Sequence, residues 1–417
     1  MQTARRAKLA PVPPAPKAQG AGRGRLFGMD LWMLALVFAM IGFGVVMVYS
    51  ASWDVSFRLY GDANALFRRQ LGNLVLGLLA MGFTAWMPIR WLRRLAVPIL
   101  GVSMLALLLV LLVNSGDGPR RAILGGSVQP SEMAKLAVII YLAVWMESKG
   151  NRLSEWGYGF IPLLMLIAII DGLILLQPDL SAVLTVAIVA LVMFYLAGAQ
   201  ISQALFISVG GAFVGYLLVR ATTTGRERWA DYMSGLIDIE QASYHVQHAL
   251  QAFYAGGIIG RGLGASREKF GLLPAPHTDS IYAVIGEELG LIGALLVLVL
   301  FWLFLWRGFK VAMNAEDRLT MLLASGVTVW IAVEALVNMS VLLGLLPFAG
   351  NALPFFSYGG SSLVVTLAAT GFLLNAARRK RVEVQAKSYV SPVGIGWRNR
   401  RRRVSRLGHN RRTRPER

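Results

Sequence analysis

The chain contains no cysteine, only four histidines and few charged residues for its length. Without cysteine it has neither a disulfide nor a thiol nucleophile, and the four histidines do not show a metal-binding spacing. Charged residues make up 15% of the 417 positions, whereas hydrophobic residues make up 56%. These shortages exclude a disulfide-stabilised domain, a zinc-finger fold and a thiol enzyme. What is present is a series of long apolar runs.

The apolar runs predict an all-α, polytopic integral membrane protein, since a run of about 18 or more apolar residues can span some 30 Å of hydrocarbon as a helix. Hydropathy indicates ten transmembrane helices, at about 29–51, 70–88, 93–114, 131–148, 157–176, 181–198, 202–220, 278–306, 318–346 and 360–377. An even number of spans puts both termini on one side. The bias of Lys and Arg makes that side cytoplasmic, so the large loop at 221–277, between the seventh and eighth helices, is extracytoplasmic.

The two ends of the chain carry its excess positive charge of +19. Residues 1–28 hold six Lys or Arg and no acid, and residues 377–417 hold fifteen against two acids. Such segments cannot bury a core, so 1–28 and 378–417 are predicted to be disordered basic cytoplasmic tails around a membrane domain at 29–377. Their charge favours a topology signal that contacts membrane lipid, not nucleic-acid binding.

Polar residues gather at the predicted outer ends of the helices. Glu132 and Lys135 are spaced i, i+3 and can face each other, either as a structural pair or as groups that contact a substrate. Ser131 just before them is a predicted N-cap. In the segment QPDLS (177–181), Asp179 is either the cap of the next helix or a functional group.

The segment PHTDSIYAVIGEELGLIG (276–293) places three carboxylates at the entrance of the eighth helix. Such groups are costly there without a partner or a function. Asp279 is an N-cap or a functional group, and the roles of Glu287 and Glu288 stay open. The segment 257–266 contains several glycines, which predict a tight turn because no strand precedes them. The loop at 346–363, rich in Pro, Gly and hydroxyl groups, is predicted to line a cavity.

Asp171 and Glu334 are two more acids inside apolar helices, and neither has an evident partner in the sequence. They are equally consistent with hydrogen bonds between helices and with functional groups.

Six segments, taken together and in this order, resemble the SEDS family (shape, elongation, division and sporulation), which includes FtsW, RodA and SpoVE. They are RRAILGGSVQPSEMAKL (120–136), QPDLS (177–181), RERW (226–229), QAFYAGGIIGRGLG (251–264), PHTDSIYAVIGEELG (276–290) and LPFFSYGGSS (353–362). The resemblance covers about 29–377. With GVVMVYSAS (44–52), it is strongest to the FtsW and SpoVE branches, and no single motif separates them from RodA.

The resemblance implies a peptidoglycan glycosyltransferase that polymerises lipid II, an undecaprenyl-diphosphate-linked disaccharide-pentapeptide, at the outer face of the bacterial cytoplasmic membrane. It further implies a role in cell division, with a class B penicillin-binding protein transpeptidase and other divisome proteins as partners. Asp279 matches the family's essential outer-loop aspartate. Glu132 and Lys135 match its functional pair. RRA at 120–122 departs from the Arg-Trp common in members, which puts the role of Arg121 in doubt.

The reaction that the resemblance implies needs a base for a sugar hydroxyl, and Asp279 is the predicted catalytic residue. Cations must stabilise the departing diphosphate. The predicted substrate-binding residues, all in the outer-side motifs, are Glu132, Lys135, Arg121, Gln177, Asp179, Arg226, Arg228 and Ser361. No cofactor is evident, and a divalent cation would fit the chemistry although no metal-site pattern is present.

Three alternatives stay open. The first is a lipid II flippase, in which Glu132, Lys135, Asp171 and Glu334 would mark the path of the head group. The second is a RodA-type polymerase for cell elongation, and the third is a scaffold that recruits the transpeptidase. The outer-side clustering of the motifs and the lack of obvious inverted repeats favour catalysis over transport.

Overall fold

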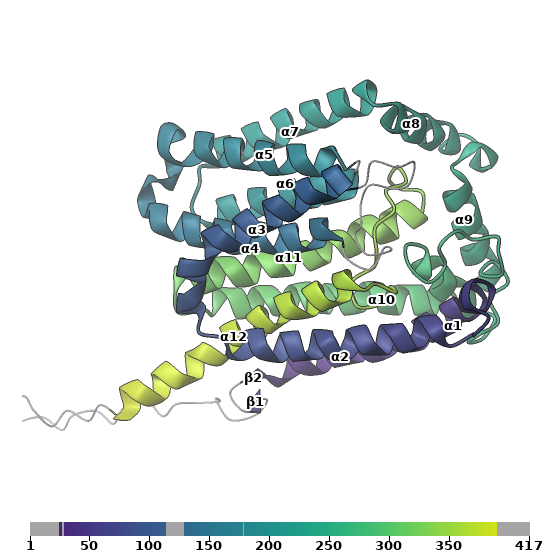
Figure 1. Cartoon of the computed structure of the whole chain (residues 1–417), viewed down its shortest axis with the longest axis horizontal. Coiled ribbons are helices and arrows are strands. Elements are labelled where there is room, and N and C mark those ends of the chain that lie inside the picture. Colours follow the sequence, from purple (N-terminus) through teal and green to yellow (C-terminus); the bar gives the residue numbers. More distant parts are fainter. Residues whose placement is uncertain (1–24, 27–28, 114–128, 178, 390–417) are drawn as a thin grey trace, which may run out of the picture.

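The computed structural model describes residues 25–26, 29–113, 129–177 and 179–389. In these ranges, ten helices of 15 to 33 residues lie side by side in one bundle (Figure 1). They are α1 (Leu31–Tyr60), α2 (Ala65–Trp86), α3 (Leu92–Val113), α4 (Pro130–Lys149), α5 (Ile161–Leu175), α6 (Leu180–Leu196), α7 (Ile201–Ala221), α10 (Ile281–Met313), α11 (Arg318–Leu342) and α12 (Ser361–Tyr389). Each overlaps one predicted helix, which confirms the all-α, polytopic fold class.

Shorter elements connect the bundle helices. The predicted extracytoplasmic loop contains α8 (Thr223–Gly235), η4 (Ile239–Gln241) and α9 (Tyr244–Gly256). One-turn helices η1 (Ile89–Trp91), η2 (Gly150–Ser154) and η3 (Trp156–Phe160) precede α3 and α5. Two strands of two residues each, β1 (Arg25–Leu26) and β2 (Met29–Asp30), pair antiparallel before α1.

Within the described ranges, seven helices are long and apolar enough to cross a membrane, counting η1 with α3 and η3 with α5. These are α1, α3, α5, α7, α10, α11 and α12, and α6 is a shorter apolar helix. The chain is therefore a multi-pass membrane protein. The total of ten membrane spans stays a prediction.

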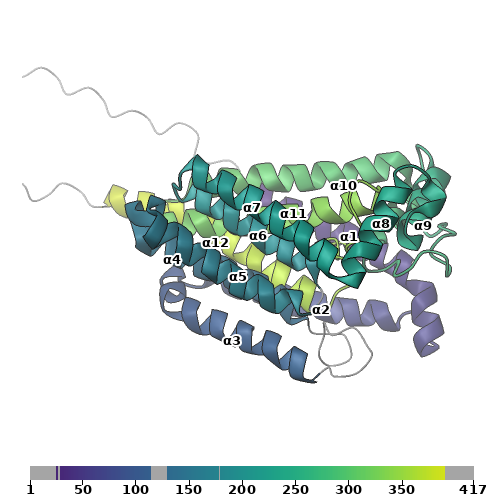
Figure 2. The ribbon, with the colours of Figure 1, turned by 90° about the horizontal axis from the view of Figure 1, so that it is seen from above.

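Successive bundle helices run in alternate directions, so α2, α4, α6, α10 and α12 all begin at the same end of the bundle. That end also carries α8 and α9, as Figures 1 and 2 show, and is called the site end below. The opposite end is held by two ion pairs. Arg307 on α10 contacts Asp30 at 2.7 Å, and Arg93 on α3 contacts Glu147 on α4 at 2.7 Å.

The central helix of the bundle is α11. It packs against α4, α6, α10 and α12. In the most apolar stretch of α11, 83% of the residues are buried, whereas no residue is buried in the most apolar stretch of α7. Polar side chains on α11 therefore face protein, not lipid. This position brings Glu334 and Asn338 into the interior near the site end.

α10 is a broken helix, whereas the sequence predicted a continuous one. Gly290 has φ 67° and ψ −164°, and a side chain there would collide with the backbone of the 257–262 segment. Backbone groups freed by the break are satisfied by that segment, since Arg261 and Gly262 donate their N–H groups to the carbonyls of Glu287 and Glu288 at 3.0 and 2.9 Å. Such partners are what make an irregular backbone tolerable inside a membrane bundle. Residues 281–289 thus form a short half-helix.

Candidate functional site

A cavity of about 240 Å³ lies at the site end, between α4, α6, α11 and the loops that precede α10 and α12. Its polar lining includes Glu132, Lys135, Asp179, Asp279, Glu334 and Ser361. Five of these six residues were predicted as site residues, and the sixth, Glu334, was predicted to have a role only in the flippase alternative. The fold thus gathers residues from five distant segments of the chain into one site.

At the base of this cavity, Lys135 lies between two carboxylates. Its Nζ donates to Oε1 of Glu132 on the same helix at 2.7 Å and also contacts Oε1 of Glu334 on α11. The ammonium also lies 5.6 Å from the ring centroid of Trp330, within the range of a cation–π interaction. A buried cation with two acids is well compensated. The predicted pair of Glu132 and Lys135 is therefore a triad with Glu334.

Asp179 connects α4 with α6. It is the N-cap of α6, because Oδ1 accepts from the N–H of Ala182 at 3.2 Å, and the predicted capping role is confirmed. Its other oxygen accepts from Ser131 Oγ at 3.2 Å and from Gln129 Nε2 at 3.3 Å. The predicted cap at Ser131 is wrong: Gln129 is the N-cap of α4, and Ser131 lies within its first turn.

Asp279 lies two residues before α10, in a segment fixed by hydrogen bonds to its backbone. Asn338 Nδ2 on α11 donates to the Asp279 carbonyl at 2.8 Å. Gly350 faces the carboxylate, since a Cβ at that position would be 3.3 Å from Oδ2. Ser280, not Asp279, is the N-cap of α10, so the N-cap interpretation of Asp279 is wrong. The backbone is thus held in place while the side chain lines the cavity.

The two residues before Asp279 are held by the loop that precedes α12. Ser357 Oγ donates to the Thr278 carbonyl at 2.6 Å, and the Tyr358 N–H donates to the His277 carbonyl at 2.7 Å. The His277 ring packs near Tyr358, with centroids 5.4 Å apart, and burial lowers the pKa of His277 to about 4. His277 is consequently neutral at physiological pH and adds no positive charge beside Asp279.

The charges of the cavity are unbalanced. The described residues of its lining include four carboxylates and one ammonium, so they carry three net negative charges when all are ionised. Oε2 of Glu132 is buried and has no hydrogen-bond partner among the described residues. Oxygen ligands of this kind suit a hard divalent cation, yet no group of three or more His, Cys, Asp or Glu in the described ranges is arranged to hold a metal. The lining favours hydroxyl donors and cations over anions.

The remaining predicted residues lie at different places. Ser361 begins α12, and its Oγ accepts from the Gln129 N–H at 2.9 Å at the cavity wall. Gln177 is fully buried away from the lining, where it donates to the Leu107 carbonyl at 2.9 Å. Arg226 and Arg228 lie on α8 and are not part of the cavity lining. Arg121 lies outside the described residues.

Sequence reasoning missed Asn338, which holds the Asp279 backbone, and Tyr358, which lines the cavity. A signal for the first was present, because Glu334 and Asn338 are spaced i, i+4 and so share one face of an otherwise apolar helix. Two polar residues on one face of a buried helix indicate a polar cavity or a partner. Tyr358 belongs to the LPFFSYGGSS motif (353–362), but it was not predicted as a site residue.

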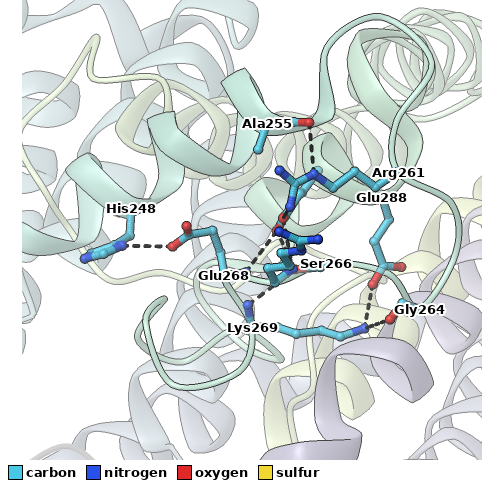
Figure 3. Close-up of polar contacts among 10 residues, drawn as sticks. His248, Ala255, Arg261, Gly264, Ser266, Glu268, Lys269 and Glu288 are labelled. Atoms are coloured by element: carbon cyan, nitrogen blue, oxygen red, sulfur yellow. Dashed lines mark hydrogen bonds and ion pairs between the residues drawn. The ribbon is translucent and has the colours of Figure 1, made fainter.

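A second polar cluster, shown in Figure 3, fastens the 257–273 segment to the half-helix of α10. The fully buried Glu287 accepts from Ser266 Oγ at 2.5 Å and from two backbone N–H groups at 2.9 and 3.2 Å, and pairs with Arg261 at 3.1 Å. Glu288 pairs with Lys269 at 2.7 Å. The two glutamates are therefore anchors of the loop, and neither lines the cavity of Asp279.

Comparisons with known proteins agree on one family. The FTSW_RODA_SPOVE family, described as cell cycle protein, matches residues 31–382. A probable peptidoglycan glycosyltransferase FtsW of Trichlorobacter lovleyi is 39% identical over 360 residues, which cover 84% of this chain and 93% of the relative.

Two solved structures are similar to this chain over 84% of its length, each with 30% identity. A chain of a peptidoglycan synthase complex, studied for the coordination of polymerization and crosslinking, superposes with a TM-score of 0.68 over 98% of that chain. The rod shape determining protein RodA of Thermus thermophilus superposes with a TM-score of 0.63 over 97% of that chain.

Proposed function

Since this chain belongs to the FtsW/RodA/SpoVE family, we propose that it is a peptidoglycan glycosyltransferase of the FtsW type, which polymerises lipid II into glycan strands during cell division. The name of the relative from Trichlorobacter lovleyi supports the activity and the branch. The observation that carries the proposal is the cavity in which Asp279 is gathered with Glu132, Lys135, Asp179 and Ser361.

In the proposed reaction, the 4-hydroxyl oxygen of one sugar attacks the anomeric carbon of a second sugar that carries the lipid-linked diphosphate. A new C–O bond forms, the bond between the anomeric carbon and the diphosphate oxygen breaks, and the diphosphate leaves with the electron pair. The hydroxyl proton passes to a carboxylate within hydrogen-bond reach. We assign this role to Asp279.

We choose Asp279 because its carboxylate lines the cavity beside Gly350. The missing side chain at Gly350 leaves room beside Oδ2 of Asp279. A hydroxyl of the acceptor sugar fits that space, and the fixed backbone of Asp279 maintains the geometry that proton transfer requires.

The arrangement in the membrane is part of the proposal. The site end faces the extracytoplasmic side, so both tails are cytoplasmic and the cavity meets lipid II at the outer leaflet. A class B penicillin-binding protein transpeptidase is the proposed partner, supported by the similarity to a chain of a peptidoglycan synthase complex. Arg226 and Arg228 on α8 stay candidates for contacts with parts of the substrate outside the cavity.

The test is to incubate the purified protein, alone and with its transpeptidase partner, with fluorescent lipid II and to separate the products by size. Glycan polymer is the expected product. A parallel assay in vesicles measures transfer of lipid II between leaflets. Movement of lipid II without any polymer, with and without the partner, would replace the proposal by the flippase alternative.

A further inference from the structure

The charge of the cavity raises the question of what binds the diphosphate of the substrate. Among the described residues that line the cavity, Lys135 is the single cation, and it is already shared by Glu132 and Glu334. A diphosphate placed among these carboxylates would be repelled. A cation that lies next to the lining and is not neutralised by an acid is suited to receive it.

Arg69, in the second turn of α2, has these properties. It is exposed, its Nη1 donates to the hydroxyl of Tyr60 at 2.8 Å, and its guanidinium lies 4.5 Å from the centroid of the same ring. Within the described ranges no carboxylate forms an ion pair with it. A tyrosine orients the guanidinium without cancelling its charge, so donors of the planar fork stay available to a phosphate.

The geometry connects Arg69 to the cavity through the loop that precedes α12. Gln70, the next residue, is buried and donates to the Ser357 carbonyl at 3.4 Å, and its Oε1 accepts from the Gly359 N–H at 3.3 Å. Tyr358, between these two residues, lines the cavity. Burial raises the pKa of Tyr358, while the charge of Arg69 and a hydrogen bond from it act in the opposite direction. Arg69 therefore lies at the rim of the cavity, beside the Tyr358 hydroxyl.

The neighbouring arginine provides a contrast. Arg68 is also exposed, but it forms an ion pair with Asp62 in the turn between α1 and α2. Two arginines adjacent in sequence thus differ in their partners: Arg68 forms an ion pair with an acid, whereas Arg69 donates to the uncharged hydroxyl of Tyr60. This difference indicates a ligand for Arg69 and supplies a matched control.

We propose that Arg69, oriented by Tyr60 and adjoining Tyr358, binds the diphosphate of the polyprenyl-diphosphate-linked substrate at the rim of the cavity. The identity of this ligand rests on the proposed function. In this arrangement the sugar to be transferred lies within the cavity, next to Asp279, and the lipid-bearing diphosphate stays outside the ring of carboxylates. Arg69 also stabilises the charge that develops on the diphosphate as it leaves.

The test measures binding of undecaprenyl diphosphate, which carries no sugar, to the detergent-solubilised full chain by native mass spectrometry or thermophoresis. We expect Arg69→Ala to raise the Kd about tenfold or more, the loss typical of a charge-assisted hydrogen bond. Arg69→Lys keeps the charge and should lie between wild type and Arg69→Ala. Binding of undecaprenyl monophosphate should change less, so that the preference for diphosphate falls. This selectivity is a readout that a merely structural role would not alter.

Arg68→Ala is the control and should keep the wild-type Kd within about twofold, because a surface charge already paired with an acid contributes little. If Arg69→Ala proves unstable in thermal unfolding, Arg69→Gln, which retains a donor for Tyr60, replaces it. Wild-type affinity in the Arg69 variants, an equal loss in Arg68→Ala, or a loss confined to the double variant Arg226→Ala, Arg228→Ala would each overturn the inference.

The outcome is separable from the proposed function. Binding that depends on Arg69 in a protein that never polymerises lipid II leaves the diphosphate site standing and removes the polymerase. Normal polymerisation together with unchanged binding in Arg69→Ala removes the site and leaves the polymerase.

Discussion

The Nζ of Lys135 on α4 contacts a carboxylate oxygen of Glu334 on α11, although 199 residues separate the two in the chain. Their side chains are only 4% and 7% exposed. Together with Glu132 they join two helices at the base of the cavity. Since a buried ion pair is strongly destabilised when one partner is removed, this contact has a direct consequence for stability.

We expect Lys135→Met to lower the stability of the protein by about 3–5 kcal/mol, because Glu132 and Glu334 are then left buried without their cation. Thermal unfolding in detergent measures the loss. Lys149→Met, at the far end of the same helix and packed on Trp145, should change stability little. Replacing the whole triad by neutral side chains of similar size should regain most of the loss. A Lys135→Met protein as stable as wild type would contradict the assignment of a buried triad.

The sequence predicted the proximity of two of the three members of this triad for a physical reason. Glu132 and Lys135 are one turn apart on one helix, so their proximity follows from helical geometry alone. Glu334 reaches Lys135 only through the packing of α11 against α4, which no local pattern in a single sequence reveals. The other cavity residues also lie far apart in the chain, so their spacing could not predict that they meet. They were named as site residues because their motifs resemble those of the family.

The limits of the helices show a similar division. Hydropathy placed the end of the first helix near 51, but α1 continues to Tyr60. Its C-cap is Gly61, which has φ 67°. The extension is more polar and contains the i, i+4 ion pair of Asp54 and Arg58. Hydropathy detects the part of a helix that crosses hydrocarbon, whereas hydrogen bonding and caps decide where the helix ends. The break at Gly290 was missed because it depends on the distant 257–262 segment.

Asp279→Asn should reduce polymerisation of lipid II by about 10²–10⁴-fold, the contribution of a general base, without unfolding the protein. The amide has the size of the carboxylate, and the hydrogen bond from Asn338 to the backbone carbonyl is unaffected. Product formation and thermal unfolding are measured on the same preparation. Asp62→Asn, in the turn between α1 and α2, is the control and should retain activity. Polymerisation by Asp279→Asn at the wild-type rate would remove Asp279 from its proposed role.

Glu287→Gln should loosen the 257–273 segment from the half-helix of α10. Three donors converge on the carboxylate in addition to Arg261, and an amide nitrogen cannot accept from them. Loss of hydrogen bonds to a buried charged group costs about 1.5–3 kcal/mol. Amide hydrogen exchange in 261–269 should accelerate about tenfold or more. Glu227→Gln on the exposed face of α8 is the control, and equal protection in both variants would show that Glu287 does not anchor the loop.

Gly371→Ala should destabilise the packing of α12 on α2. A Cβ at Gly371 would collide with the Thr84 hydroxyl and the Met81 carbonyl, where Thr84 also donates to the Ala368 carbonyl at 2.8 Å. Overpacking of this kind costs about 1–3 kcal/mol. Gly82→Ala on α2 meets no atom within 4 Å and should be neutral or slightly stabilising. A comparison of the two midpoints of thermal unfolding checks the contact, and equal midpoints would refute it.

His277 makes the stability of the site end depend on pH. Burial lowers its pKa from 6.5 to about 4, so between these values the unfolded chain binds a proton that the folded protein does not. Stability is therefore fully present above about pH 6.5 and falls as the pH decreases toward 4. With about 1.4 kcal/mol for each pKa unit, the loss is on the order of 3 kcal/mol at most.

We expect the thermal midpoint of wild type to fall between pH 7.5 and 5 by more than that of His277→Gln, which has no proton to bind. The Tyr358 ring beside His277 does not titrate in this range. Identical pH profiles of the two proteins would show that His277 is not buried as a neutral ring beside Asp279.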